Sequence, residues 1–273
     1  MIIDSHAHAC GRFLMGKNII SDLNQNNVQK LVLVPGELDS NKEYFIPNIA
    51  KQFPKKDVVR FTNIITKLII KVTKKLKDIE QGNEYVYSLV QKYPERLIQF
   101  YWCVLSISGI MEKLEKDYKE WRFRGLKLHQ CWEKFSFRSE IFINVAKFAE
   151  YNNLPIFIHV YHKKDVLELI QFLKENPKIK IIIGHLFGLE EYINSKLHFP
   201  NTYFEISTPQ LVSESRLLKA INYFGPDKIL FGSDVPYGKN NQKLNIERIK
   251  NLDINEVDKD KILGDNIRVI LNI

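Results

Sequence analysis

Eight short and almost continuous apolar runs recur along the chain and constrain its fold more than any other feature. The runs are "MIIDSHAHA", "KLVLVPG", "RLIQFYWCVL", "RGLKLHQ", "LPIFIHVY", "KIIIGHL", "TYFEIST" and "KILFGSDVP". Runs of this kind are typical of parallel strands that are covered on both sides, and the segments between them are long enough for helices. Eight alternations of strand and helix predict an α/β fold, the (β/α)8 TIM barrel. The length of 273 residues fits one such domain over residues 1–273.

One connection between the predicted strands is much longer than the others. The strands are expected to start at Ile2, Lys30, Leu97, Arg124, Pro155, Ile179, Thr202 and Lys228. The second connection carries an excess of about 40 residues, whereas the others suit a single helix, such as those expected over 139–153 and 163–177. In a right-handed barrel this excess lies in the loop that leaves the second strand, at the rim where active sites form. We therefore expect an insertion from Glu37 to Gly82 that acts as a lid.

The insertion contains the segment "NIITKLIIKVTKKLK", which can form an amphipathic helix. Its apolar face would carry Ile65, Leu68, Ile69, Val72 and Leu76, and its lysines Lys67, Lys71, Lys74 and Lys75 would lie mostly elsewhere. Such a face has to be buried, against the site, the barrel or a second copy. A basic helix on a membrane surface and a β-strand are the alternatives.

Composition excludes several classes of protein. Hydrophobic residues make up 45% and charged residues 26%, and no apolar stretch is long enough for a membrane span. The first strand leaves no room for a signal peptide, and three cysteines (Cys10, Cys103 and Cys131) at no metal-like spacing fit inert thiols in a reducing compartment, so we expect a cytoplasmic protein. The net charge of +8 favours anionic ligands, but its lysines are scattered and predict no specific nucleic-acid binding.

Polar side chains collect where the apolar runs end. These residues are His6, His8, Lys127, His129, His159, His185 and Asp234. Because strand side chains alternate, His6 and His8 are expected to share one inward face with Asp4 beneath them. Burying so many polar groups unpaired would be costly, so a metal site is the economical explanation. Imidazole and carboxylate are ligands of zinc and related ions, which activate a bound water.

The ordered set of motifs resembles the amidohydrolase superfamily, in particular its amidohydrolase-2 branch. The matching segments are "DSHAH", "NQNNVQKLVLVP", "RGLKLHQ", "LPIFIHV", "IIIGHLFG", "DKILFGSDVPYG" and "ILGDNIRVIL". The resemblance implies that the metal ligands are His6, His8, His159 and Asp234. It also implies that His185, together with Asp234, manages protons on the attacking water or polarises the substrate, a task that suits the usual pKa of histidine.

Three residues keep open roles in second-metal or substrate binding. Binuclear members of the superfamily use a carboxylated lysine where Lys127 stands, whereas a bare ammonium could hold a substrate carboxylate. His129 could contact substrate or a second metal, or be a simple rim residue. Arg12 could bind an anion or be a surface side chain. We expect one ion, most simply zinc, with two ions as the alternative.

The expected function is therefore that of a metal-dependent hydrolase that opens an amide, ester or lactone bond in a small anionic metabolite with metal-activated water. The alternative is a non-oxidative decarboxylase of an aromatic or unsaturated carboxylic acid, which the same branch also contains. A metal-dependent nuclease is the third hypothesis, although related nucleases place Glu where this chain has Lys127. A homodimer is expected by analogy.

Overall fold

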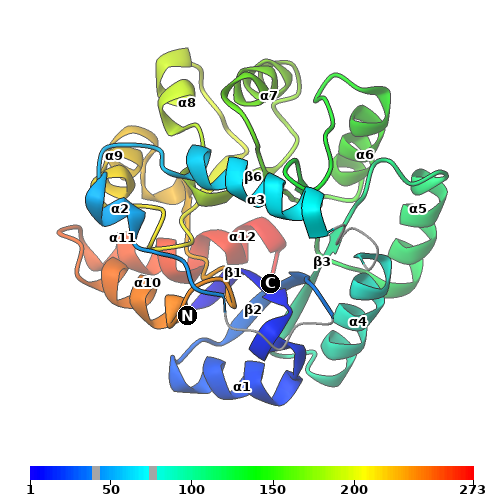
Figure 1. Ribbon diagram of the computed structural model, residues 1–273, viewed down its shortest axis with the longest axis horizontal. Coiled ribbons are helices and arrows are strands. Elements are labelled where there is room, and N and C mark those ends of the chain that lie inside the picture. Colours follow the sequence, from blue (N-terminus) through cyan, green and yellow to red (C-terminus); the bar gives the residue numbers. More distant parts are fainter. Residues whose placement is uncertain (39–43, 74–78) are drawn as a thin grey trace.

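The computed structural model describes residues 1–38, 44–73 and 79–273, and of residues 71–73 only the backbone. The strands are β1 (Ile3–Ala9), β2 (Lys30–Pro35), β3 (Leu97–Trp102), β4 (Gly125–His129), β5 (Ile156–His159), β6 (Ile181–Ile183), β7 (Thr202–Glu205) and β8 (Ile229–Leu230). The helices are α1 (Gly16–Gln25), α2 (Ile49–Gln52), α3 (Val59–Thr73), α4 (Ile79–Lys92), α5 (Ile110–Trp121), α6 (Glu140–Tyr151), α7 (Lys163–Glu175), α8 (Leu189–Ser195), α9 (Glu214–Phe224), α10 (Asn241–Lys250), α11 (Glu256–Asp260) and α12 (Asn266–Leu271). The helices surround the strands (Figure 1).

The eight strands form one parallel sheet in the order β1 to β8. The segment after β8 returns to β1 and closes the sheet. The amide of Ser5 donates to the carbonyl of Phe231 over 3.0 Å, the amide of Asp234 donates to the carbonyl of His6 over 2.7 Å, and Ala7 bridges Val235. The predicted (β/α)8 barrel is confirmed.

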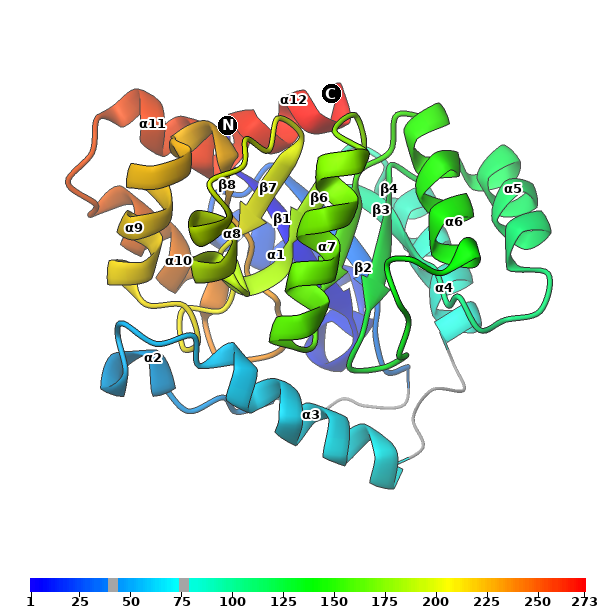
Figure 2. The same ribbon diagram turned by 90° about the horizontal axis from the view of Figure 1, so that it is seen from above.

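Apolar side chains fill two separate layers of the barrel. One cluster lies inside the barrel and includes Ile3, Val32, Val34, Phe100, Phe157, Ile182 and Leu230. The side chains of α12 belong to this inner cluster, so α12 closes the end where the strands begin. Figure 2 shows α12 at one end of the barrel and α2 and α3 at the other. The larger cluster lies between the strands and the surrounding helices.

A β-bulge in β1 changes which side chains face the interior. The register with β2 pairs Asp4 with Leu31 but Ala7 with Leu33, so three steps on β1 match two on β2. Ile3 therefore points inward with His6 and His8, whereas Asp4 points outward and accepts a hydrogen bond from Gln242 of α10 over 2.9 Å. The expectation that Asp4 shares the inward face with the histidines is wrong, because strict alternation does not pass through a bulge.

The insertion after β2 lies at the end of the barrel where the strands finish, as predicted. Its α2 and α3 cross this end in Figure 2. The amide of Ala50 donates to the carbonyl of Gln210 over 2.9 Å, beyond β7. Arg60 donates to both carboxylate oxygens of Glu191 on α8 over 2.7 and 2.6 Å. The insertion is thus attached to the rim through polar contacts.

The predicted helix is confirmed as α3, but its apolar face points away from the barrel. We call this the outer face of α3, and it consists of Phe61, Ile64, Ile65, Leu68 and Ile69, which are 41–60% exposed. The residues that face the barrel are instead Val59, Asn63 and Ile70. The expectation that Ile65, Leu68 and Ile69 pack against the barrel is therefore wrong. The side chains of Val72 and Leu76, assigned to the same face, lie outside the described residues.

A search of the described residues for a helix with the length and hydropathy of a membrane span finds none.

Asp57 provides a test of how strongly the insertion is held. Its buried carboxylate accepts a hydrogen bond from the amide of Gly188 over 2.9 Å and lies 3.3 Å from the guanidinium of buried Arg216. Asp57→Asn keeps the shape but removes the charge beside that guanidinium. Because Arg216 keeps its two contacts with Glu190, we expect the free energy of unfolding to fall by roughly 2 kcal/mol in urea titrations, the range for a hydrogen bond to a charged group.

The matched control for this experiment is Asp265→Asn, because Asp265 pairs with Arg268 at the surface, where both side chains are at least 40% exposed. An exposed pair contributes less than about 1 kcal/mol. Equal effects of the two substitutions would show that the buried pair does not secure the insertion.

Candidate metal centre

The barrel brings most of the predicted residues to one rim. His6 and His8 lie on β1, Lys127 and His129 on β4, and His159 ends β5. His185 follows β6 in a 3-10 turn, and Asp234 follows β8 in the segment that closes the barrel. Both of these last residues have a left-handed backbone, with φ of 60° and 58°, a conformation that is uncommon for residues other than glycine.

His6, His8 and Asp234 form a compact group. One ligand atom of each lies within 4.8 Å of the others, and all three residues are buried. The Oδ1 atom of Asp234 is 3.4 Å from His8 Nε2 and 3.7 Å from His6 Nδ1. Two imidazoles and a carboxylate in this arrangement are a suitable donor set for a divalent metal.

The hydrogen bonds of His8 fix which of its nitrogens can bind a metal. Nδ1 lies 2.8 Å from the carbonyl oxygen of Pro35, which can only accept, so Nδ1 carries the proton. In the neutral ring Nε2 then has a free lone pair, and it faces the carboxylate of Asp234. A divalent cation between these two groups would satisfy both of them, as would a second proton on the ring.

The same reasoning applies to His185 and His159. His185 Nδ1 donates to the carbonyl of Ser207 over 2.7 Å, which leaves Nε2 unprotonated in the neutral ring. His159 Nε2 contacts Asn63 Oδ1 over 2.6 Å. The amide group of Asn63 donates to two backbone carbonyls, so Oδ1 is its acceptor and His159 Nε2 carries the proton.

The two remaining nitrogens, His159 Nδ1 and His185 Nε2, are 3.1 Å apart with no proton left to join them. Burial lowers the pKa of both rings below the usual value for histidine, which favours these neutral forms. In the part of the chain that the structure describes, no proton joins these converging lone pairs, and a cation bound at one of them would relieve the contact. The residues present therefore fit a divalent metal.

His159 is not in the same compact group as the other three predicted ligands. Its ligand atoms cluster instead with His129 and Cys131, and its ring stacks on that of His129 at 4.0 Å. It reaches the first group through His185, whose ring lies 5.8 Å from that of His6. Its membership of the metal ligand set stays a prediction.

Lys127 lies at the centre of the site. Its ammonium is fully buried, 3.1 Å from His6 Nε2 and 3.9 Å from the centre of the Phe157 ring. Burial lowers its pKa to about 7, although the carboxylates of Asp234 and Glu205 oppose this shift. Near neutral pH both the amine and the ammonium are accessible, so the group can hold an anion or react as an amine.

The structure turns Arg12 toward α1 and not toward the histidines. Its guanidinium forms an ion pair with Asp22, whose pKa is raised by burial. Cys10, Cys103 and Cys131 are free and buried, as expected of inert thiols, and burial raises the pKa of Cys10 and Cys131 to about 12.

Sequence reasoning missed two site residues, Glu205 and Asn63. Glu205 is fully buried and accepts hydrogen bonds from the amides of His185 and Ser207 over 3.2 and 2.6 Å. Burial raises its pKa to about 8. A glutamate inside the apolar run "TYFEIST" was a signal that could have revealed it. Asn63 offers no such signal, because it lies in the insertion, 96 residues before His159.

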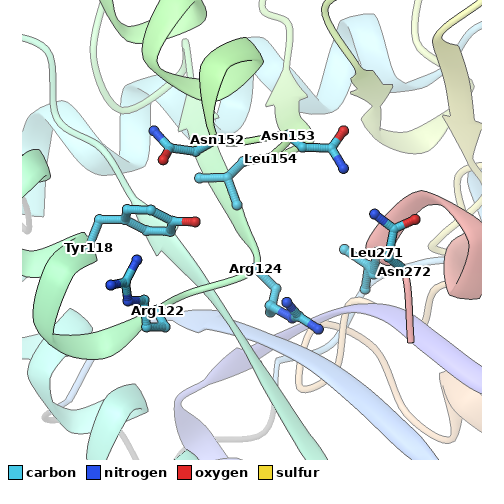
Figure 3. Close-up of a pocket in the computed structure, with 8 residues that line it drawn as sticks. All are labelled: Tyr118, Arg122, Arg124, Asn152, Asn153, Leu154, Leu271 and Asn272. Atoms are coloured by element: carbon cyan, nitrogen blue, oxygen red, sulfur yellow. The ribbon is translucent and has the colours of Figure 1, made fainter.

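One hollow of the described surface is distinct from the histidine site. It measures about 290 Å³ and is lined by residues that include Arg124, Leu154 and Asn272 (Figure 3). Arg124 directly precedes β4, and Leu154 lies just before β5, so the hollow is at the opposite end of the barrel from the histidines. It does not take part in the candidate centre.

Solved structures with the same fold include enzymes of several activities. A probable 2-pyrone-4,6-dicarboxylic acid hydrolase from Acinetobacter baumannii is 16% identical, with a TM-score of 0.69 over 100% of this chain and 99% of that chain. A 2,6-dihydroxybenzoate decarboxylase from Rhizobium is 14% identical, with a TM-score of 0.70 over 99% and 98%. A 5-carboxyvanillate decarboxylase from Novosphingobium aromaticivorans, with bound manganese, is 11% identical, with a TM-score of 0.69 over 100% and 97%.

These identities support the shared fold alone. No curated protein matches the sequence. The model of the family described as Amidohydrolase, however, matches residues 72–273, which is well over half of the chain and confirms the resemblance found in the motifs. The protein therefore belongs to the amidohydrolase family.

Proposed function

We propose that this amidohydrolase is a metal-dependent hydrolase that opens an amide, ester or lactone bond in a small anionic metabolite. The observation that carries the proposal is the compact buried group of His6, His8 and Asp234, in which His8 Nε2 faces the carboxylate over 3.4 Å. The unprotonated nitrogens of His159 and His185 converge nearby, with the ring of His185 5.8 Å from that of His6. A buried group of neutral imidazoles and a carboxylate suits metal binding better than any role within the core.

The residues that would hold the metal are His6, His8, His159 and Asp234. We propose one divalent ion, zinc, with Lys127 uncarboxylated. Nitrogen and oxygen donors suit zinc and related ions, and a divalent metal is present in the manganese-bound decarboxylase of similar fold. Lys127 would then be available to bind a carboxylate of the substrate.

A bound divalent metal supplies an activated water and polarises the carbonyl of the substrate. Around it, His185 is oriented by its hydrogen bond to the carbonyl of Ser207 and presents Nε2 as a proton acceptor. The carboxylate of Asp234 would accept and release protons together with His185. The Lys127 ammonium and the ring of His129, which stacks between Trp102 and His159, would bind and orient an anionic substrate.

A decarboxylase of an aromatic or unsaturated carboxylic acid is the second candidate. Two of the solved structures with this fold are decarboxylases of aromatic acids. The same residues would hold the same metal, with Lys127 on the carboxylate. Release of carbon dioxide by an active substrate would identify a decarboxylase, whereas consumption of one water per turnover would identify a hydrolase.

We also propose that the enzyme works in the cytoplasm without a nucleic-acid or membrane partner. The buried free thiols support a reducing compartment.

The metal can be tested with His6→Ala. We expect purified protein to hold about one zinc per chain by elemental analysis, and the variant to lose the ion and at least about 100-fold in activity, because one ligand is missing. His198→Ala is the matched control, since His198 is exposed and outside the site. Wild-type protein without metal, or an active His6→Ala variant, would refute the proposal. Two ions and a carboxylated Lys127 would instead establish a binuclear centre.

We further propose that two copies of the chain associate through the outer face of α3. The support is its exposure, since contiguous large apolar side chains at a surface usually mark an interface. A symmetric dimer would place this face against itself.

Leu68→Glu introduces a charge at the centre of the outer face of α3 and should dissociate the dimer in sedimentation or light-scattering measurements. Leu167→Glu is the control, because Leu167 is a similarly exposed leucine, 51% against 59%, on α7. A wild-type protein that is monomeric at micromolar concentration would exclude this interface.

A further inference from the structure

Asn63 joins the insertion to the histidine site. It lies on α3 and is only 1% exposed. Its amide group donates to the carbonyls of Val160 and Tyr161, just after β5, over 2.9 and 3.0 Å. Its Oδ1 atom accepts a hydrogen bond from His159 Nε2 over 2.6 Å. Every polar atom of this side chain is therefore directed at β5 or at the segment that follows it.

These contacts determine the orientation of Asn63 itself. A flipped amide would place Oδ1 against two carbonyl oxygens and its NH₂ group against the ring, which removes both donor bonds. The acceptor for His159 is thus fixed by the backbone after β5. A short hydrogen bond to a fixed acceptor holds the proton on Nε2 and the ring in one orientation.

The consequence for His159 is that Nδ1 is the nitrogen left to face the site. Nδ1 lies 3.1 Å from His185 Nε2, and the lone pairs of these two nitrogens point toward each other. Without Oδ1 the proton could move to Nδ1, and the ring could then donate to His185. That hydrogen bond would engage both nitrogens, so His159 Nδ1 would be lost as a metal donor and His185 Nε2 as a proton acceptor.

We propose that Asn63 is a positioning residue that makes metal binding depend on the docking of α3. This inference rests on the proposed metal-dependent function. Asn63 does not touch the metal or substrate; it selects the form of His159 that can donate to the metal. Because the acceptor belongs to the insertion, metal affinity is high only while α3 is docked.

Linkage makes this dependence reciprocal. A ligand that binds the docked state more tightly shifts the protein toward that state by the same factor. Metal binding should therefore hold α3 on the rim. The insertion is rich in lysine, including Lys55, Lys56 and Lys67, so trypsin can report on its docking.

The first measurement is zinc affinity by competition with a chelator. Asn63→Leu removes the acceptor and should weaken zinc binding by about 10- to 100-fold, the usual effect of losing a partner of a metal-binding histidine.

Asn266→Leu is the matched control for packing. Asn266 is buried and also donates from its amide to two backbone carbonyls, those of Pro226 and Ile229, each over 2.8 Å. It lies at the other end of β8, away from the histidines. This variant should lose stability but keep the zinc affinity of wild type.

The second measurement does not need metal. Nitrogen NMR of the imidazole rings in metal-free protein should show His159 protonated at Nε2 in wild type and shifted toward Nδ1 in Asn63→Leu. Saturating zinc should also slow tryptic cleavage of the insertion in wild type at least about fivefold more than in Asn63→Leu, as the linkage requires.

Three results would overturn the inference: unchanged zinc affinity in Asn63→Leu, equal weakening of zinc binding in Asn63→Leu and Asn266→Leu, or a His159 protonated at Nδ1 in metal-free wild type. A wild-type protein that binds no zinc, manganese or other divalent ion is a different outcome. It would refute the proposed function, and the inference with it, even if the NMR spectrum showed the expected form of His159.

Discussion

Closure of the parallel sheet is the constraint on which the rest of the molecule depends. The hydrogen bonds of Ser5 and Asp234 join the two edges and bring residues from the beginning and end of the chain into one rim. Since all eight strands run the same way, the residues that follow them must meet at the same end. Histidines from β1, β5 and the turn after β6 are therefore neighbours although nearly 180 residues separate the first from the last.

Hydrogen bonds at the nitrogens that face away from the centre fix the protonation of three rings, those of His8, His185 and His159. Pro35, Ser207 and Asn63 each accept one imidazole proton, and each of these acceptors is held by the backbone or by backbone contacts. The inward nitrogens of His8 and His159 are left as donors for a metal, and that of His185 is left as a proton acceptor. Burial reinforces this arrangement at His159 and His185, because it lowers the pKa of both rings and so disfavours their charged form.

Much of this could be predicted from the sequence because the strands are nearly pure apolar runs. The predicted strand starts lie within two residues of those observed, and the residues after the runs reach the rim as expected. The role of Asp4 could not be predicted, since a bulge depends on pairing with β2 and not on local pattern. The direction of α3 also escaped prediction, because its apolar stripe is continuous while its buried contacts come from Val59, Asn63 and Ile70. The metal, its count and the substrate remain predictions.

The bulge in β1 determines which face of the strand carries His6 and His8. Three residues of β1 span the distance that two residues span on β2, so His6 and His8 face inward only because one extra residue lies between Asp4 and Ala7. If the same residues were paired with β2 in strict alternation, without the bulge, an inward Ile3 would turn both imidazoles toward the helices. The strand would gain regularity while the centre lost two donors. The irregular pairing of β1 therefore directs His6 and His8 toward the donor groups that the other strands contribute.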